Sequence, residues 1–218
     1  VCSLKVSVIT VTYNSQDYIN DCIKSVREQT YKNIEYIVID GASTDNTLKI
    51  VKSKKIYLSK LISEPDEGIY YAMNKGIKFA KGEIICFLNS DDFFVNNEII
   101  SRVAKEFKKD SLLDACYADL IYVDRFNTSK TVRYLKSSKF KEGLFSKGWC
   151  PPHPTFYVRR SVYKKFGNFD LSYRFASDVE LMMRFLEKYK IKSKYIPEVW
   201  VKMRMGGVTN KNLKNIWL

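Results

Sequence analysis

The sequence predicts an α/β protein with a mostly parallel central sheet flanked by helices. Through the first hundred residues, short β-branched and apolar runs alternate with segments whose apolar residues recur at helical spacing. The chain has 218 residues, of which 45% are hydrophobic, so it can bury one sizeable core. No internal repeat or low-complexity linker divides it. We therefore expect a single domain over residues 1–218.

Each element of the first half follows from its local pattern. Strands are predicted where β-branched and apolar residues run together, at residues 5–12, 35–40, 60–63 and 83–88. Helices are predicted where apolar residues recur every three or four positions, at residues 18–26, 43–51, 70–80 and 98–108. Strand and helix in alternation favour parallel pairing, so the carboxyl ends of the strands should meet at one edge of the sheet.

The second half has a different pattern. Strands are expected at residues 115–123 and 131–135, and a proline-rich loop at residues 149–154. A helix begun by Ser177 and Asp178 is expected at residues 177–189, and a last strand, ended by a glycine pair, at residues 199–205. We interpret residues 1–110 as a nucleotide-binding half. Residues 111–218 are then an acceptor-binding half with a smaller sheet.

The net charge of +13 implies an anionic partner. No arginine-rich helix, zinc finger or aromatic RNA-binding signature accompanies the lysines, so we do not expect nucleic acid. Residues 134–147 mix lysines with leucine and phenylalanine, which suits the surface of an anionic membrane. A lysine-rich, solvated surface remains the alternative.

The five cysteines form no CxxC pair and no zinc spacing, which favours reduced thiols in a cytoplasmic protein. No apolar stretch approaches the length of a bilayer span, and no signal peptide is evident. The apolar residues 216–218 at the end suggest that a membrane-facing tail follows. We therefore expect a cytoplasmic protein, peripheral at the inner face of the plasma membrane.

Two adjacent carboxylates, Asp91 and Asp92, directly follow the apolar run at residues 84–88. A strand that ends in this way presents two hard oxygen ligands at the lip of the sheet where ligands bind. Neighbouring carboxylates repel each other, and Mg²⁺ or Mn²⁺ relieves that repulsion while also holding substrate phosphates. A polar strand exit with a helix cap is the alternative.

Polar residues also follow the first two strands. Thr12, Tyr13 and Asn14 end the first, and residues 40–45 (DGASTD) end the second. The absence of GxGxxG after the first strand disfavours a dinucleotide fold, and GxxxxGK[ST] is absent as well. Asp40 can accept hydrogen bonds from a base or a ribose. Turn and capping chemistry explains any one of these residues alone.

Together these segments resemble the inverting nucleotide-sugar glycosyltransferases of family 2, which have the GT-A fold. The resemblance rests on VSVITVTYN, DGASTD and NSDD at residues 6–14, 40–45 and 89–92. Further segments are similar to the subgroup found in bacterial O-antigen and capsule clusters: SEPDEGIYYAMNKG, PHPTF and ASDVELMMR at residues 63–76, 152–156 and 176–184.

The resemblance implies a role for each matching residue. Asp91 would ligate a Mn²⁺ or Mg²⁺ ion on the diphosphate, and Asp92 would support that ion or orient the sugar. Asn89 stands where the family usually has Asp, so ligation depends on Asp91. Glu67 stands where the subgroup often has Lys or Arg, which puts the nearby donor contact in doubt. The residues expected to bind the nucleotide are Thr12, Tyr13, Asn14, Asp40, Ser43, Asp45, Asn74, Lys75, Gly76, Ser90 and Asp91.

An inverting transfer needs a base on the face opposite the leaving diphosphate. The resemblance makes Asp178 that base, with Glu180 as a substitute. An N-terminal helix cap at Ser177 and Asp178 is the alternative. His153, the only histidine, is expected to contact the diphosphate, the metal or the acceptor. Arg204 is expected to form, with residues 206–209, a lid over the diphosphate.

The sequence therefore predicts a metal-dependent enzyme that transfers a hexose or N-acetylhexosamine from a UDP-sugar to a saccharide. We expect the acceptor to be linked to a lipid diphosphate. Processive synthesis is not expected, because the QxxRW signature is absent. Two alternatives stay open: a non-catalytic, lysine-rich binder of polyanions or membranes, and a nucleotidyltransferase.

Overall fold

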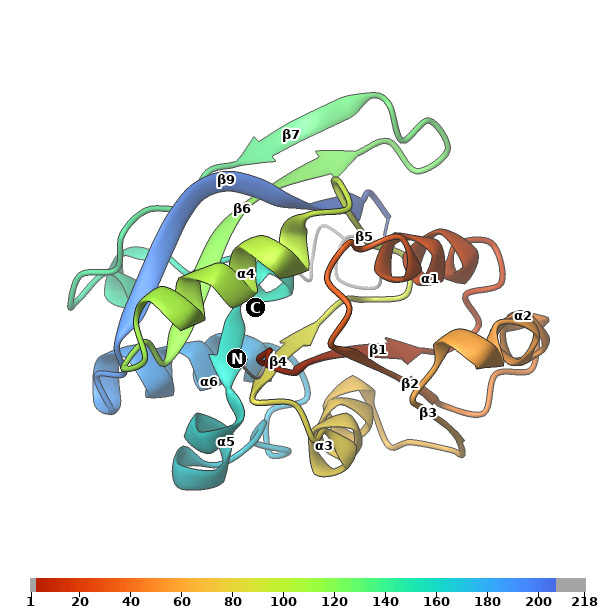
Figure 1. The fold of residues 1–218 in the computed structure, drawn as a ribbon, viewed down its shortest axis with the longest axis horizontal. Helices are drawn as coiled ribbons and strands as arrows, with labels where there is room; N and C mark the ends of the chain where they lie inside the picture. Colours follow the sequence, from red (N-terminus) through yellow and green to blue (C-terminus); the bar gives the residue numbers. More distant parts are fainter. Residues whose placement is uncertain (1–2, 207–218) are drawn as a thin grey trace.

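The computed structural model describes residues 3–206. In this part of the chain, nine strands form one continuous sheet (Figure 1). They are β1 (Val6–Thr12), β2 (Ile34–Asp40), β3 (Lys60–Ser63), β4 (Ile84–Phe87), β5 (Phe93–Phe94), β6 (Ala115–Val123), β7 (Thr131–Leu135), β8 (Tyr157–Arg159) and β9 (Ser193–Arg204). Their order is β3-β2-β1-β4-β8-β6-β9-β5, and β7 pairs with β6 at the edge.

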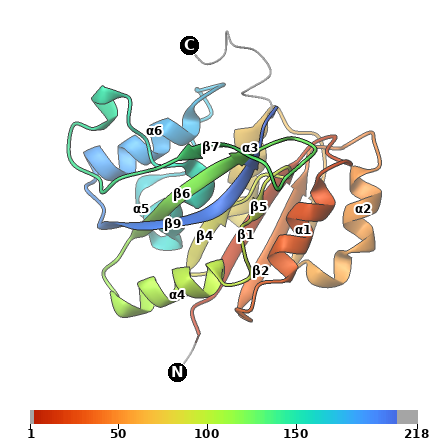
Figure 2. The ribbon, with the colours of Figure 1, turned by 90° about the horizontal axis from the view of Figure 1, so that it is seen from above.

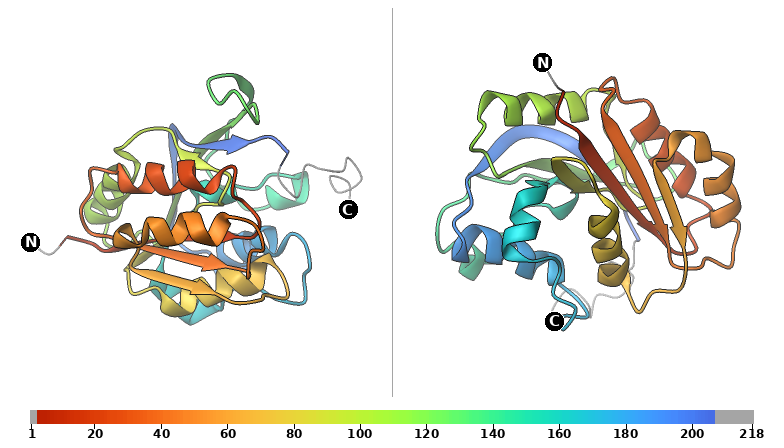
Figure 3. Two further views of the ribbon diagram at one scale, coloured as in Figure 1. Left: turned by 90° about the vertical axis from the view of Figure 1, so that its right-hand side faces the viewer. Right: turned by 60° about the horizontal axis from the view of Figure 1, so that its bottom comes forward.

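Helices cover both faces of the sheet. The α-helices are α1 (Ile19–Arg27), α2 (Thr47–Ser53), α3 (Ile69–Phe79), α4 (Ile99–Lys109), α5 (Arg160–Phe166) and α6 (Ser177–Met183). One hydrophobic core joins α1, α2 and α4 to the sheet, and a second joins α3, α5 and α6 to its opposite face. Figures 2 and 3 show these two layers from above and from two further sides.

The first half has the predicted parallel topology. Strand β1 pairs in parallel with β2 and β4, and β2 pairs in parallel with β3. All seven residues of β1 are buried, as expected for a β-branched strand between two helix layers. The carboxyl ends of these strands therefore lie at one edge of the sheet.

In the second half, the expected acceptor-side strands continue the same sheet through β8. This strand pairs antiparallel with β4 on one side and with β6 on the other. Strand β9 is parallel to β6 and starts at Ser193, well before the predicted residue 199. The register passes from Ile196 to Val199, so Pro197 and its neighbour lie in a bulge. A bulge is where a proline, which lacks an N–H group, fits within a sheet.

Short helical turns complete the structure. The predicted loop at residues 149–154 contains the 3₁₀ turn η3 (His153–Thr155). A π-helical turn, η4 (Arg184–Lys188), continues α6, so the apolar face predicted for residues 177–189 is one helical segment. Two other 3₁₀ turns are η1 (Lys55–Tyr57) and η2 (Phe145–Lys147).

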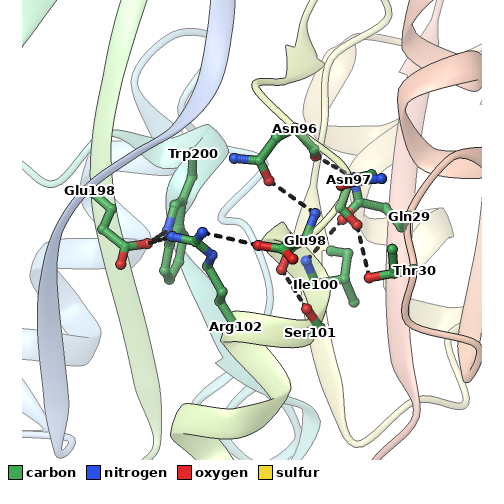
Figure 4. Close-up of polar contacts among 10 residues, drawn as sticks. All are labelled: Gln29, Thr30, Asn96, Asn97, Glu98, Ile100, Ser101, Arg102, Glu198 and Trp200. Carbon is green, nitrogen blue, oxygen red and sulfur yellow. Dashed lines mark hydrogen bonds and ion pairs between the residues drawn. The ribbon is translucent and has the colours of Figure 1, made fainter.

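Polar contacts fix the start of α4, which follows the acidic strand exit (Figure 4). The side chain of Gln29 donates to the carbonyl of Asn96 at 2.8 Å and accepts from the backbone N–H of Ile100 at 3.0 Å. It thereby satisfies an N–H group that the helix itself leaves unpaired. Arg102 binds Glu198 of β9 at 2.7 Å, which ties α4 to that strand. The segment between β4 and α4 is thus anchored where it enters α4, and α4 itself is anchored to β9.

Among residues 3–206, no helix is both long and apolar enough to cross a bilayer. The predicted strand end at the glycine pair is a turn at Met205 and Gly206. The lid expected at residues 206–209 and the apolar residues 216–218 lie, apart from Gly206, outside the described residues.

Candidate active site

The three polar strand exits are bonded to one another. The backbone N–H of Asn14 donates to the hydroxyl of Ser43 at 2.9 Å, which joins the loops after β1 and β2. The hydroxyls of Ser15 and Ser90 lie 2.8 Å apart, which joins the loops after β1 and β4. The prediction that these exits meet at one edge is confirmed, and the contacts make the edge a preorganised unit.

Within this unit, three of the predicted nucleotide-binding residues also hold the loops. The side-chain oxygen of Asn14, a residue with φ +49°, accepts from the backbone N–H of Thr44 at 2.9 Å. Asp45 accepts from the N–H groups of Gln16 and Thr47. Burial raises the pKa of Asp45, but these hydrogen bonds outweigh it and keep the pKa below 3.8. The turn and capping hydrogen bonds that were the alternative role of these residues are therefore present, and Ser43 takes part in them.

Asp40, at the end of β2, is fully buried. Its carboxylate accepts hydrogen bonds from the backbone N–H and hydroxyl of Ser43 and from the Ser63 hydroxyl, the last at 2.6 Å. Thr12 lies opposite Asp40 in the register, and its buried hydroxyl oxygen has no hydrogen-bond partner among the described residues. The ring of Tyr13 is 62% exposed. An aromatic face, a carboxylate and an unused hydroxyl suit a planar, polar ligand such as a base.

The two carboxylates after β4 differ in their surroundings. Asp92 is fully buried and accepts from the side-chain amide of Asn89 at 3.0 Å and from the backbone N–H of Arg204 at 3.3 Å. Burial raises the pKa of Asp92 well above 3.8, and the adjacent charge of Asp91 raises it further. Burial also raises the pKa of Asp91, while the charges of Arg204 and Arg125 lower it. Asp91 is thus the carboxylate with fewer hydrogen-bond partners among the described residues.

Arg204 lies beside this pair with its side chain 6% exposed. It binds Asp21 and donates to the backbone carbonyl of Arg125 at 3.2 Å, while its Nε has no partner among the described residues. Arg125 and Arg204 both place their guanidinium groups over the ring of Tyr18, at 5.1 and 5.3 Å from its centre. No motif in the sequence points to Arg125, because a single arginine in a polar turn is unremarkable. The two guanidinium groups make this side of the site suited to an anion.

On the acceptor side, Asp178 lies in the first turn of α6 and is partly buried. Its carboxylate accepts a hydrogen bond from the hydroxyl of Tyr70 at 2.8 Å. The helix begins without a side-chain cap, and the Ser177 hydroxyl donates to the carbonyl of Asp170 at 2.8 Å. The capping alternative for Ser177 and Asp178 is therefore not what the structure contains.

His153 packs against the end of β4. Its ring stacks on Phe87 with a centroid distance of 5.5 Å and meets Phe169 edge to face at 5.6 Å. Burial lowers the pKa of His153, whereas the nearby charge of Asp178 raises it, and the net direction is downward from 6.5. His153 is thus a neutral ring at pH 7. Asp178 reaches the end of β4 by another route, because the ring of its partner Tyr70 stacks on Phe169, and Phe169 meets Phe87, the last residue of β4, at 5.3 Å.

Three residues predicted near the nucleoside are used within the protein. The side-chain amide of Asn74 donates to the carbonyl of Phe169 at 2.9 Å and accepts from its N–H at 3.0 Å. Lys75 pairs with Glu64 and Asp66 at 2.6 and 2.8 Å. Gly76 is buried where α3 packs closely on β1. These contacts give Asn74, Lys75 and Gly76 a part in holding the fold, and their place near the nucleoside stays a prediction.

Glu180 is also committed elsewhere. Both of its carboxylate oxygens accept hydrogen bonds from Arg184, at 2.7 and 3.1 Å. Arg184 in turn donates to the carbonyls of Phe166 and Asn168. A bidentate pair of this kind holds its carboxylate firmly. This pairing makes the Glu180 carboxylate less available than that of Asp178, and its role as a substitute base stays a prediction.

The donor set fits a hard divalent ion that relies on its substrate for most ligands. Within residues 3–206, no group of three or more His, Cys, Asp or Glu side chains is arranged to hold a metal. Asp91 offers one carboxylate, and Asp92 supports it. Mg²⁺ and similar ions are commonly bound by one or two carboxylates together with substrate phosphates and water. The residues present therefore fit an ion that arrives with a diphosphate.

A family model described as Glycosyl transferase family 2 matches residues 7–167. The chain belongs to glycosyl transferase family 2. An uncharacterized glycosyltransferase of Mycobacterium tuberculosis is 32% identical to this family member over 180 residues, which are 82% of this chain and 68% of that protein.

Solved glycosyltransferase structures share the fold. Staphylococcus aureus TarS 1–349 in complex with UDP has a TM-score of 0.74 and 25% identity over 93% of this chain and 61% of that chain. The mannosyltransferase PcManGT from Pyrobaculum calidifontis, in complex with GDP-Man and Mn²⁺, has a TM-score of 0.73 and 20% identity over 96% of this chain and 59% of that chain. The described chain thus spans about three fifths of these structures. The GT-A fold predicted for this family 2 glycosyltransferase is confirmed.

Proposed function

We propose that this family 2 enzyme transfers a hexose or N-acetylhexosamine from a UDP-sugar to a saccharide acceptor with inversion at the anomeric carbon. The observation that carries the proposal is that Asp40 and Asp91 follow strands whose exits are bonded together at one edge of the sheet, while Asp178 is linked to the end of β4 through Tyr70 and Phe169. The complex of TarS with UDP supports a uridine donor. Family membership favours transfer over the alternatives of a polyanion binder and a nucleotidyltransferase.

In this proposal each group has one chemical task. Asp40, Thr12 and Tyr13 bind the uracil, and Arg204 and Arg125 face the diphosphate. A divalent ion held by Asp91, with Asp92 in support, would neutralise the charge of the leaving diphosphate. The complex of PcManGT with Mn²⁺ supports such an ion.

Asp178 is the proposed general base. It takes the proton of the acceptor hydroxyl while that oxygen forms its bond to the anomeric carbon. The bond from this carbon to the diphosphate oxygen breaks on the opposite face, and its electron pair leaves with UDP. The neutral, buried His153 keeps an apolar wall beside the reacting groups and excludes water from them.

The finer assignments belong to the same proposal. Residues 1–110 bind the donor and residues 111–218 bind the acceptor. The acceptor is a lipid-diphosphate-linked saccharide of O-antigen or capsule assembly, reached from the cytoplasmic leaflet. The net charge of +13 and the exposed lysines of residues 136–147 support contact with an anionic membrane there.

Calorimetry with UDP, with and without Mn²⁺, tests the donor site, and a UDP-release assay with a panel of UDP-sugars tests transfer. We expect Mn²⁺ to strengthen UDP binding at least tenfold, a gain that Asp91→Asn loses. Asp178→Asn should bind UDP normally and lose about a hundredfold or more in kcat, the contribution typical of a general base. Asp110→Asn, at the far end of α4, is the matched control and should retain activity. UDP binding that responds to neither Mn²⁺ nor Asp91→Asn would overturn the proposal.

A further inference from the structure

Helix α3 holds the segment that carries Asp178 with two side chains one turn apart. Tyr70 donates from its hydroxyl to the Asp178 carboxylate at 2.8 Å. Asn74, four residues later on the same face, accepts from the N–H and donates to the carbonyl of Phe169, at 3.0 and 2.9 Å. The two contacts fix residues 169–178 at both ends.

Helix α3 is itself firmly placed. Lys75 binds Glu64 and Asp66, the residues that follow β3, and Gly76 lets the helix pack closely on Ile9 of β1. A side chain on a helix fixed in this way has a defined direction. The ring of Phe169 further restricts the orientation of the Tyr70 side chain, because the two rings stack with a centroid distance of 5.5 Å.

The hydroxyl of Tyr70 is a dependable donor. Burial raises its pKa above 10, the charge of Asp178 raises it further, and the N–H groups of Ser177 and Asp178 oppose that change only in part. Tyr70 therefore keeps its proton throughout the working pH range. The other titratable groups that face Asp178 are His153, whose pKa is lowered mainly by burial, and Cys150, whose pKa burial raises to about 12. Both are uncharged at pH 7, so neither contributes a positive charge beside the carboxylate.

We infer that Tyr70 is a positioning residue for the general base, an inference that rests on the proposed function. Its hydroxyl occupies one carboxylate oxygen of Asp178 and leaves the second for the proton of the acceptor hydroxyl. Tyr70 thereby links the donor-side helix α3 to the acceptor-side base.

Tyr70→Phe tests this inference, since it removes the hydroxyl and keeps the ring that stacks on Phe169. We expect kcat to fall about tenfold to a hundredfold, which is part of the contribution of a positioned base, with the Kd for UDP unchanged. The KM for the acceptor should stay close to that of the wild type, because the lost hydroxyl holds the base and binds neither substrate. Tyr71→Phe, the adjacent residue on α3, is the matched control and should behave like the wild type.

A second variant separates positioning from folding. Asn74→Ala removes the other contact of α3 and should lower the thermal stability while reducing kcat less than Tyr70→Phe does. If Tyr70→Phe lowers the thermal stability and reduces kcat no more than Asn74→Ala does, Tyr70 is merely structural and the inference is wrong. Wild-type kcat in Tyr70→Phe would overturn it as well. Activity in Asp178→Asn refutes the proposed base itself, which distinguishes that failure from this one.

Discussion

Replacing Gly76 with alanine distinguishes a packing role from the nucleoside contact that the family resemblance implied. An added Cβ would lie 2.5 Å from Cγ2 of Ile9 and 3.6 Å from Cγ1 of Ile39. Ile9 is fully buried on β1, which is bonded to a strand on either side. Its Cγ2 is a branch carbon that cannot move away without a rotamer change or a shift of the strand. The contact must therefore be relieved at the expense of packing between α3 and the sheet.

The magnitude follows from two opposing contributions. Overpacking a well-filled core costs about 3 kcal/mol at the upper end of its usual range. Alanine is favoured over glycine inside a helix by about 1 kcal/mol. We therefore expect Gly76→Ala to lower the free energy of unfolding by about 2 kcal/mol.

Urea unfolding measures that change, and calorimetry at a temperature where the variant is folded measures UDP binding. We expect the Kd for UDP to match the wild type. In a double-mutant cycle, Ile9→Ala should offset part of the loss, because it removes the carbon that the new Cβ meets. Unchanged stability together with a large rise in Kd would refute the reasoning and restore Gly76 to the nucleotide site.

Three further variants test other parts of the structure. Asn14→Ala should weaken UDP binding about fivefold in calorimetry, since one hydrogen bond that holds the loop after β2 is lost; an unchanged Kd would contradict this. Glu35→Ala should lower the free energy of unfolding by about 3 kcal/mol in urea, because the buried carboxylate accepts from the Ser7 hydroxyl and two backbone N–H groups. The hydrogen bond from Lys194 holds the pKa of Glu106 below 4.5, so this pair stabilises the fold above that pH and its contribution disappears as pH falls through the folded-state pKa. Glu106→Gln should therefore lose less stability than the wild type on acidification from about pH 5 to pH 3, and equal losses would show that the pair contributes nothing.

The first half of the fold could be predicted because each of its elements carries its own local signal. Residues 6–12 are a buried, β-branched run, and α1 and α4 have apolar residues at helical spacing. The second half depends on pairings between distant parts of the chain. Strands β5 and β8 have two and three residues, too few for a periodic pattern, and each exists because a longer strand lies beside it.

The residues of the candidate site divide in the same way, into those with a local sequence signal and those placed by contacts between distant parts of the chain. Asp40 and Asp91 could be proposed from local signals, because a carboxylate after an apolar strand is visible in the sequence, whereas Asp178 was proposed through the family resemblance. The partner of Asp178 could not be predicted, since Tyr70 is 108 residues away and appears in the sequence as one apolar position of a helix. Arg125 was missed for the same reason. Its guanidinium reaches the site only because β6 and β9 are paired.

The motif that includes Asn74 and Gly76 shows how a family pattern combines two kinds of residue. Some positions of such a pattern contact the ligand, and others hold the backbone in the conformation that this contact needs. Sequence similarity cannot separate them, because both kinds are fixed by the same geometry. The structure separates them by contact: both polar ends of the Asn74 side chain are bonded to Phe169, and Gly76 has no room for a side chain. Tyr70 belongs to neither kind alone, since it packs against Phe169 as part of the fold and its hydroxyl binds the carboxylate that we propose as the general base.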